Sequence, residues 1–473
     1  QIGEIMKIEI AQIKLKTGDF NFNYENIIKY IEKSDAGLII FPRSDIEALG
    51  GKDLVYNEAC LQKEVEMFEK IAGKNYPKTI LIGDVLIKDE MAEEVEFFEF
   101  DGRKVYVSDS FIEDVDCDLY VLSHNKYFAM NTYDAFVESI DAKTDFIFIS
   151  SIGMADENIF AGGSFAKNKN NELVLQLPVC EEVSATVDFE KPAEFHPENT
   201  EESVYKVTTF ALREYCENTG FKKVILGLSG GIDSALTAAL AADALGRENV
   251  LGVLMPSMFS SEGSVTDSIA LAQNLGIKTI KHSITPLFDN FMEKVAHERL
   301  HDLAEENLQA RLRALILMFF SNRDNYLLLS TGNKSEASMG YGTLYGDLAG
   351  GYNLICDLTK TNVYKLANYI NRNGEIIPQE IIDKAPSAEL RPNQKDQDSL
   401  PEYAVLDDII EMYVEKLCPL EEIYEKYDRA LVDETVKKIH RAQFKRKQCC
   451  LGVRLTERSF TNGVSYPIVQ RYL

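Results

Sequence analysis

A short turn of Ser229, Gly230 and Gly231 constrains this chain more than any other feature, because it joins a predicted strand directly to a predicted helix. The apolar residues 223–226 before the turn are typical of a buried strand, and residues 235–245 after it, rich in Ala and Leu, favour a helix. Unpaired backbone N–H groups and the positive end of a helix dipole meet at such a junction. The two glycines let the backbone come close to a ligand because they carry no Cβ. The chain is therefore expected to form an anion site where a strand passes into a helix.

The side chains around the turn indicate that the anion is a phosphate group. Ser229 and Ser234 supply hydroxyl donors. Asp233 would repel a phosphate unless a metal ion bridged the two, so we expect Asp233 to bind Mg²⁺. The Gly-Lys-Ser/Thr ending of a Walker loop is absent. The pattern Ser-Gly-Gly-x-Asp-Ser instead resembles the loop of enzymes that split ATP into AMP and pyrophosphate, where it holds the departing pyrophosphate.

Composition limits the kinds of partner that this chain can have. A chain of 473 residues is too long for one typical core, which favours two domains. The formal net charge of −26 argues against nucleic acids and anionic membranes as partners. The eight cysteines form no C-x-x-C pair, and no apolar run approaches the ~20 residues that span a bilayer. Together with the lack of a recognisable signal peptide, this predicts a cytoplasmic protein with reduced thiols.

The first half of the chain predicts a layered α/β domain over residues 6–188. Apolar runs favour strands at residues 6–13, 36–41, 78–83, 104–108, 118–122 and 145–150, and helical patterns cover residues 24–32, 58–71 and 132–139. Residues 1–5 precede the first strand pattern, and we exclude them from the predicted fold. Residues 189–201 change to Glu, Lys, Pro, His and Asn, which predicts a linker.

The second half, residues 202–473, predicts a doubly wound parallel sheet. A helix at residues 202–219 leads into the turn described above, and a strand at 250–255, a helix at 265–275 and a strand at 279–283 follow it. Repeated strand–helix–strand units require parallel strands, and such sheets bind ligands at the carboxyl ends of the strands.

Four later segments carry polar and charged side chains in a fixed order. Asn307 and Arg311 are four apart on a predicted helix, residues 329–336 run from a strand end into a polar loop, and residues 341–351 are too rich in Gly to form a helix. Lys360, the segment 384–390 and a basic cluster around Lys445 follow. In this order they resemble the NAD synthetases, the amidating ligases that make NAD from deamido-NAD. Residues 343–351, 452–460 and 466–468 have the form of the longer, glutamine-dependent members.

This resemblance implies a fold, a reaction and a set of site residues. The second half would be an ATP-pyrophosphatase domain that adenylates deamido-NAD, releases pyrophosphate and lets ammonia displace AMP, mainly by positioning and by holding phosphate charge. ATP and Mg²⁺ are implied as substrate and cofactor, deamido-NAD and ammonia as the other small-molecule partners, and a homo-oligomer as the assembly. Residues 386–402 would form a lid over the substrates. The implied ligands of ATP are Gly227, Leu228, Ser229, Gly230, Gly231, Ile232, Asp233, Ser234, Thr331, Lys360 and Ser387; those of Mg²⁺ are Asp233 and Glu336; those of deamido-NAD are Asn307, Arg311, Glu336 and Lys445.

The first half resembles the nitrilase-type glutaminase domain of the same enzymes, but without its catalytic residues. Residues 11–20, 39–42, 49–54 and 160–165 follow that domain's pattern. The active domain needs a Cys nucleophile, a Glu base and a Lys. Arg43 stands at the position of the Glu and Ser108 at that of the Cys, and the segment that carries the Lys is missing between residues 84 and 100. We expect a degenerate glutaminase domain, so that the enzyme uses free ammonia.

Three alternatives stay open at this point. Relocated groups such as Glu47 and Cys117 would allow a working glutamine-dependent synthetase. Another ligase that splits ATP into AMP and pyrophosphate, acting on a nucleotide base or a tRNA, would share the loop at residues 227–234. If both halves were decayed, the chain would be a scaffold, but the intact residues Asp233, Glu336 and Lys360 favour an enzyme.

Overall fold

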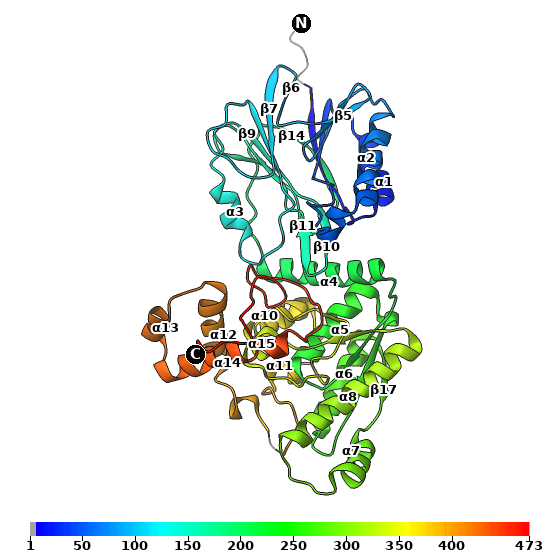
Figure 1. Ribbon diagram of the computed structural model, residues 1–473, viewed down its shortest axis with the longest axis vertical. Coiled ribbons are helices and arrows are strands. Elements are labelled where there is room, and N and C mark those ends of the chain that lie inside the picture. Colours follow the sequence, from blue (N-terminus) through cyan, green and yellow to red (C-terminus); the bar gives the residue numbers. More distant parts are fainter. Residues whose placement is uncertain (1–5, 393, 473) are drawn as a thin grey trace. The chain divides into compact units, whose positions relative to one another are not determined.

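The computed structural model describes residues 6–392 and 394–472, in two compact units that divide between Val207 and Thr208. Figure 1 shows both units, each of which is described here by itself. The division falls inside α4 (Thr200–Thr219), a few residues beyond the predicted linker. Residues 1–5, which we left out of the predicted fold, lie outside the described residues. Among the described residues, no helix is both long and apolar enough to cross a membrane.

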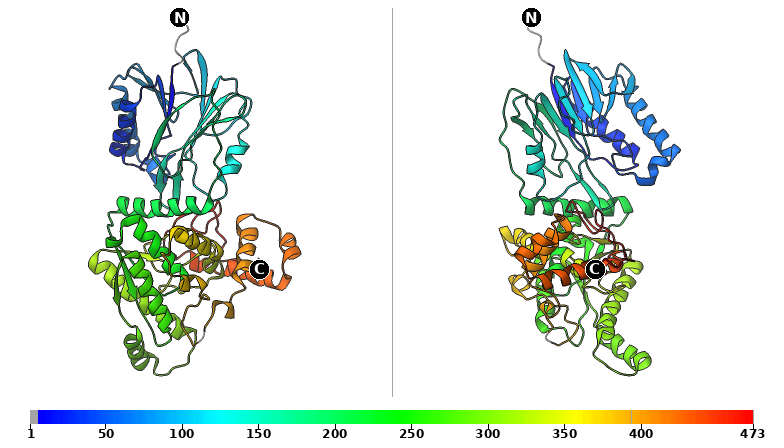
Figure 2. Two further views of the ribbon diagram at one scale, coloured as in Figure 1. Left: turned by 180° about the vertical axis from the view of Figure 1, so that it is seen from behind. Right: turned by 60° about the vertical axis from the view of Figure 1, so that its left-hand side comes forward.

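The first unit contains two six-stranded sheets, in the orders β14-β1-β2-β3-β4-β5 and β13-β12-β9-β8-β7-β6, and a small β10-β11 hairpin. Figure 2 shows the two sheets lying against each other. The elements of this unit are β1 (Ile8–Gln12), α1 (Phe20–Lys33), β2 (Leu38–Phe41), the 3₁₀ helix Lys52–Tyr56, α2 (Glu58–Ala72), β3 (Thr79–Ile82), β4 (Val85–Lys88), β5 (Met91–Glu94), β6 (Phe97–Phe100), β7 (Arg103–Ser108), β8 (Leu119–Ser123), α3 (Tyr133–Ser139), β9 (Asp145–Ile149), β10 (Ile152–Ala155), β11 (Asn158–Ala161), β12 (Phe165–Lys167), β13 (Leu173–Gln176) and β14 (Val183–Val187).

Alternation along the strands explains why these sheets form a four-layer sandwich. In β2, Leu38 and Ile40 face the core between the sheets, whereas Ile39 and Phe41 face α1 and α2. In β9, Ile147 and Ile149 join the same central core, whereas Phe146 and Phe148 pack in the cluster that holds Val137 of α3. Figure 1 shows α1 and α2 on one side of the sheets and α3 on the other. Strands buried on both faces need continuous apolar runs, which is why the sequence predicted them. The expected α/β sandwich is confirmed.

The second unit is built on one five-stranded sheet in the order β17-β16-β15-β18-β19, in which every pair is parallel. Besides α4, its elements are β15 (Val224–Gly227), α5 (Ile232–Leu245), β16 (Val250–Leu254), α6 (Glu262–Leu275), β17 (Lys278–Lys281), α7 (Thr285–Phe291), α8 (Leu303–Asp324), β18 (Leu327–Ser330), α9 (Lys334–Met339), β19 (Tyr352–Asn353), α10 (Lys360–Ile370), α11 (Gln379–Asp383), α12 (Tyr403–Ile410), α13 (Leu420–Lys426), α14 (Arg429–Arg441) and α15 (Gln443–Arg446), with short 3₁₀ or π turns at Arg247–Asn249, Met292–Ala296, Asn371–Asn373, Asp396–Asp398 and Glu411–Glu415. The predicted parallel sheet is confirmed.

Strand order in this sheet locates the ligand site. The chain runs from β15 outward to β16 and β17, and then returns to the other side of β15 to form β18 and β19. Where the connections from two adjacent strands lead off to opposite sides of the sheet, they leave a crevice at the carboxyl ends of those strands. Here that crevice lies beyond β15 and β18, where the Gly-rich turn and residues 331–333 begin.

The start of α5 was wrong in the sequence analysis. The helix begins at Ile232 rather than at residue 235, so Asp233 and Ser234 lie in its first turn. Asp and Ser are poor residues for a helix interior but favourable in a first turn, next to the positive end of the dipole. The loop is therefore shorter, and its carboxylate is fixed by a helix.

Candidate active site

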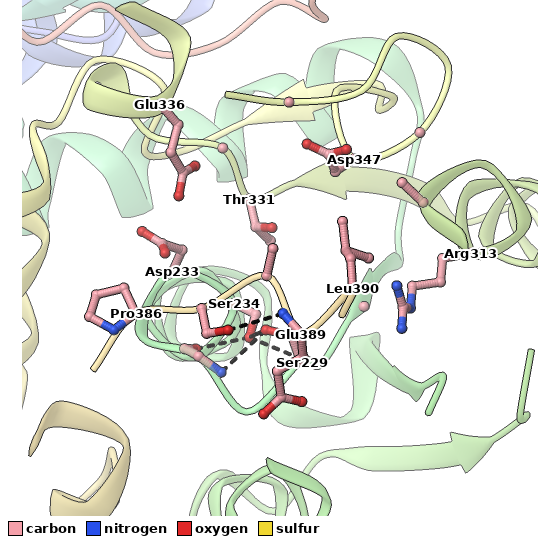
Figure 3. A pocket seen from close by; sticks show the side chains of 18 of the residues that line it. Ser229, Asp233, Ser234, Arg313, Thr331, Glu336, Asp347, Pro386, Glu389 and Leu390 are labelled. Atoms are coloured by element: carbon pink, nitrogen blue, oxygen red, sulfur yellow. Dashed lines mark hydrogen bonds between the residues drawn. The ribbon is translucent and has the colours of Figure 1, made fainter. Parts of the chain in front are cut away.

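A cavity of about 780 Å³ opens at the carboxyl ends of β15, β16 and β18 (Figure 3). Its walls include the Gly-rich loop at residues 227–234, residues 254–268, one face of α8, residues 328–332 and residues 340–349. Glu336, Lys360, Lys445 and the lid segment, which we define as residues 384–392, add to them. Residues far apart in sequence therefore meet around one space.

The Gly-rich loop is held open by its own serines. Ser234 Oγ accepts a hydrogen bond from the Ser229 N–H (3.3 Å) and donates one to the Gly231 carbonyl (3.0 Å). Gly230 has φ = +77°, and a Cβ there would lie 2.4 Å from the Ser264 carbonyl oxygen, so only glycine fits. No side chain caps the N-terminus of α5, whose first N–H groups stay available for an anion.

A carboxylate–lysine–carboxylate cluster stands next to this loop. Lys360 Nζ lies 2.5 Å from Asp233 Oδ2 and 3.6 Å from Glu336 Oε1, and Asn333 Nδ2 donates to the other Asp233 oxygen at 2.9 Å. Figure 3 shows Asp233 and Glu336 pointing toward each other. Burial, and then the charge of Asp233, raise the pKa of Glu336 to about 8. Burial alone would lower the pKa of Lys360, but the two carboxylates outweigh it and raise that pKa.

Glu336 is held in place by the start of α9. Asn333 is the N-cap, its side chain accepts from the Glu336 N–H at 2.9 Å, and Glu336 Oε2 accepts from the Asn333 N–H at 3.2 Å. This reciprocal pair is a capping box. Glu336 Oε2 therefore caps the helix, and Glu336 Oε1 faces Lys360 in the cavity.

Two carboxylates in this arrangement fit a small divalent cation. Among the described residues, no group of three or more His, Cys, Asp or Glu side chains could hold a metal ion by itself. Mg²⁺ in phosphate-handling sites typically takes one or two carboxylates and completes its shell with phosphate oxygens and water. Asp233 and Glu336 match that donor set.

Most of the residues named from the sequence line this cavity. Thr331 follows β18, Ser387 lies in the lid segment, and Asn307 accepts a hydrogen bond from Thr343 at 2.7 Å. Lys445 Nζ donates to the carbonyls of residues 340 and 342 at 2.8 and 2.7 Å. The structure brings together the predicted residues 227–234, Thr331, Lys360, Ser387, Glu336, Asn307 and Lys445. Their roles toward particular ligands stay predictions.

Arg311 lies outside the cavity wall, and Arg313 takes a place in it. Arg311 is exposed, and its Nε donates to the Leu344 carbonyl at 3.1 Å. Arg313 lines the cavity, its Nε donates to the Met255 carbonyl at 3.1 Å, and burial lowers its pKa to about 10. The lining face of α8 is centred on Ala310, and each helical residue turns by about 100°, so Arg311 points away. Centring the face on the apolar residues would have identified Arg313.

Two acidic residues of the cavity also escaped the sequence analysis. Asp347 accepts from the Thr343 N–H at 2.9 Å, and burial raises the pKa of its carboxyl. Glu389, in the lid segment, accepts hydrogen bonds from Ser261 and Ser264. Both lie in segments singled out from the sequence, but the segments alone gave neither residue a role, because Asp347 is placed by the fold of its own loop and Glu389 by contacts to α6.

In the first unit, Arg43 and Ser108 stand just beyond β2 and at the end of β7. Arg43 Nε lies 2.8 Å from Asp45, and its Nη1 lies 3.3 Å from Asp109 and 3.6 Å from Asp84. Ser108 Oγ donates to the Ser110 carbonyl at 2.7 Å. A guanidinium paired with three carboxylates cannot act as a general base. The Ser108 hydroxyl is thus engaged with its own main chain.

The two candidate replacements named from the sequence, Glu47 and Cys117, lie in different surroundings. Glu47 is exposed. Burial raises the pKa of the Cys117 thiol, whose Sγ lies 3.9 Å from Thr144 Oγ1. A raised pKa reduces the thiolate fraction that a nucleophilic cysteine needs.

Comparison with known proteins agrees with this architecture. The family model described as NAD synthase matches residues 204–449. The glutamine-dependent NAD(+) synthetase of Aquifex aeolicus is 34% identical and aligns with 99% of this chain and 100% of its own length. The corresponding protein of Synechocystis is 42% identical over 69% of this chain, which spans 61% of that relative's length.

Solved structures extend the likeness to the whole chain. The glutamine-dependent NAD+ synthetase of Acinetobacter baumannii, solved in complex with adenosine diphosphate, has a TM-score of 0.75 and 30% identity and covers 98% of each chain. A glutamine-dependent NAD(+) synthetase of Cytophaga hutchinsonii has a TM-score of 0.84 at 18% identity, which supports the fold alone. The chain therefore belongs to the NAD synthetase family of ligases, in the long architecture where a nitrilase-like unit precedes the synthase unit.

Proposed function

We propose that this protein joins ammonia to deamido-NAD in a reaction driven by ATP, with AMP and pyrophosphate as the other products. The observation that carries the proposal is the placement of Asp233, Lys360 and Glu336 beside the Gly-rich loop, at the carboxyl ends of adjacent parallel strands. Loop N–H groups and hydroxyls suit phosphate oxygens, and the paired carboxylates suit a metal ion bound to them. A cavity of about 780 Å³ has the size of a small-molecule site.

The chemistry needs a site that handles phosphate charge. A carboxylate is a poor acyl donor because its leaving group would be oxide. In the first step its oxygen attacks the α-phosphorus of ATP, and the bond to pyrophosphate breaks. The N–H groups at the start of α5 and the hydroxyls of Ser229 and Ser234 would hold the charge that develops on pyrophosphate. Ammonia then attacks the acyl carbon and loses a proton, and AMP leaves.

Asp233 and Glu336 would hold Mg²⁺, which neutralises phosphate charge when it is bound. Burial, and then the charge of Asp233, raise the pKa of Glu336, and a divalent ion bound between the two carboxylates would favour their charged forms. Lys360 lies between them in this structure and is close enough to the loop to contact a phosphate group. Thr331 and Ser387 would add hydroxyl contacts to ATP.

Deamido-NAD would lie against Asn307, Glu336 and Lys445. Asn307 and Lys445 line the cavity and contact residues 340–343 of its wall. The contact proposed for Arg311 rests on the family resemblance alone, because its side chain does not line the cavity.

Free ammonia is the nitrogen source in this proposal. The ion pairs of Arg43 and the hydrogen bond from Ser108 to the Ser110 carbonyl support it, because these two residues stand where glutamine hydrolysis requires a base and a nucleophile. A second candidate, a synthetase that hydrolyses glutamine through relocated groups, is favoured by the names of the relatives. The state of Glu47 and Cys117 speaks against it.

Isotope exchange tests the adenylation step without any nitrogen source. The enzyme is incubated with ATP, Mg²⁺, deamido-NAD and labelled pyrophosphate. We expect label in ATP only when deamido-NAD is present. NAD in place of deamido-NAD is the matched control, because an amide cannot accept the adenylyl group. Exchange without deamido-NAD, or no exchange with it, would overturn the proposed function.

A further inference from the structure

The lid segment is fastened to the first turn of α6 by a carboxylate. Glu389 Oε1 lies 2.7 Å from Ser264 Oγ and 2.9 Å from Ser261 Oγ, and its Oε2 accepts from the Ser261 N–H at 3.3 Å. Lys384, at the other end of the segment, donates to Ser264 Oγ at 2.6 Å and lies 3.2 Å from Asp267. We call these four side chains, Ser261, Ser264, Lys384 and Glu389, the clasp.

The clasp touches the Gly-rich loop through Ser264. The backbone of Ser264 packs so closely on Gly230 that a Cβ on the glycine would lie 2.4 Å from the Ser264 carbonyl oxygen. One residue thus contacts the loop with its main chain and the lid segment with its side chain. A shift of either partner is transmitted to the other, because close-packed groups cannot move independently.

The backbone of Glu389 adopts an uncommon conformation at this contact. Its backbone has φ = +48°, in the left-handed region that non-glycine residues rarely adopt. The neighbouring bonds hold this turn: Ser387 Oγ accepts from the Glu389 N–H at 3.1 Å, and Gln309 Nε2 on α8 donates to the Leu390 carbonyl at 2.9 Å. The negative charge also stands at the positive end of the α6 dipole. The segment is therefore held at both walls of the cavity, by α6 and by α8.

We propose that the clasp is the positioning device that keeps the lid closed over the acyl adenylate until ammonia arrives, with Glu389 as its decisive residue. This inference rests on the proposed function. An open lid admits water, whose oxygen attacks the acyl carbon and loses a proton while the acyl–phosphate bond breaks. The products are deamido-NAD and AMP, so one ATP is consumed without forming NAD. Closed sites suppress such hydrolysis of reactive intermediates.

The ratio of AMP to NAD produced measures this leak. In the parent enzyme with saturating ammonium we expect a ratio of roughly 1, because closure excludes water. Glu389→Ala is expected to raise the ratio several-fold, and more strongly when ammonium is limiting, because water then competes longer. Glu389→Asp should restore part of the coupling and Glu389→Gln less, since the glutamine keeps the shape but loses the charge.

Glu375→Gln is the matched control, because it changes an exposed carboxylate outside both the clasp and the predicted lid. Its ratio should equal the parent's. Ser264→Ala removes the hydroxyl that Lys384 and Glu389 share, while the lid segment keeps its own sequence. It should also raise the ratio. A ratio near the parent's in both Glu389→Ala and Ser264→Ala, with each variant folded by its melting temperature, overturns the clasp. A parent enzyme without deamido-NAD-dependent exchange overturns the proposed function instead.

Discussion

At the scale of single residues, the cavity is organised around one buried lysine shared by two carboxylates. Lys360 has almost no exposure, and such an ammonium is stable only when it is paired. Asp233 supplies the closer partner and Glu336 the more distant one. The net charge of the cluster therefore depends on whether Glu336 carries a proton.

Removing the charge of Asp233 should abolish function without unfolding the protein. In Asp233→Asn, Glu336 no longer faces a second carboxylate, so its pKa falls and it ionises beside Lys360. The lysine keeps a partner, and the melting temperature should change little. Turnover should fall by about 100-fold or more, because a group that holds phosphate charge is lost. Steady-state NAD formation and calorimetric melting check this; a turnover within a few-fold of the parent's would contradict it.

His440 should make the stability of the second unit depend on pH. It is buried, its Nε2 lies 2.7 Å from the Tyr413 hydroxyl, and burial, followed by the nearby charge of Arg446, lowers its pKa. The unfolded chain takes up this proton near pH 6.5 whereas the folded chain resists it, so the free energy of unfolding falls as the pH drops below that value.

Denaturation of the parent and of His440→Gln at pH 7.5 and at pH 5.5 measures this linkage. The glutamine keeps a polar group at this position but does not titrate, so the loss of stability on acidification should be smaller in the variant. Equal losses in the two proteins would show that His440 does not contribute. Many carboxylates also titrate in this range, which is why only the difference between the proteins is informative.

At the scale of elements, the junction of β15 and α5 combines two constraints in one glycine. Gly230 needs a left-handed φ, and it also leaves no space for a Cβ against Ser264. Gly220, just after α4, needs a similar φ of +81°, but a Cβ there would meet nothing within 4 Å. Comparing the two glycines therefore distinguishes the effect of backbone strain from that of steric exclusion.

Replacing each glycine by alanine should give different results. Gly220→Ala should cost about 1 kcal/mol of stability, from left-handed backbone strain alone, and leave turnover unchanged. Gly230→Ala should in addition displace the loop from α6 and abolish ATP binding. Equilibrium binding of ATP and thermal melting distinguish the two variants. Comparable ATP binding by both would contradict the described packing of the loop.

The elements also indicate how far the sequence alone can lead. Runs such as β2 and β9 were predictable because both of their faces are buried. The hairpin strands β4, β5 and β6 were missed because they are short, lie toward the sheet edges and carry charged residues. The pairing of β14 with β1 joins segments far apart in sequence, which no local pattern encodes.

The candidate site divides in the same way. The Gly-rich loop, Thr331, Glu336 and Lys360 carry local signals and lie together as expected. Arg313 and Glu389 are placed by contacts to other elements, and Asp347 by the fold of its own loop. Residues within local motifs could therefore be predicted from the sequence. The orientation of a helix face and the closure of a loop could not, because they depend on tertiary packing.

At the scale of the whole molecule, a chain with a formal charge of −26 has to bind anionic nucleotides. Arg313, Lys360, Lys384 and Lys445 supply positive charge in the cavity, beside the carboxylates that also line it. In the first unit, at the position where the resemblance expects a Glu base, Arg43 is surrounded by aspartates. In the proposed function, the second unit carries the chemistry and the first unit hydrolyses no glutamine.

The most direct test of this account compares the two nitrogen sources in the intact protein. NAD formation is measured from deamido-NAD, ATP and Mg²⁺, with ammonium chloride in one reaction and ammonia-free glutamine in the other, and glutamate release is followed alongside. The account predicts NAD with ammonium, and neither NAD nor glutamate with glutamine. Comparable NAD from glutamine, with matching glutamate, would contradict the degenerate first unit, and no NAD from either source would contradict the synthetase itself.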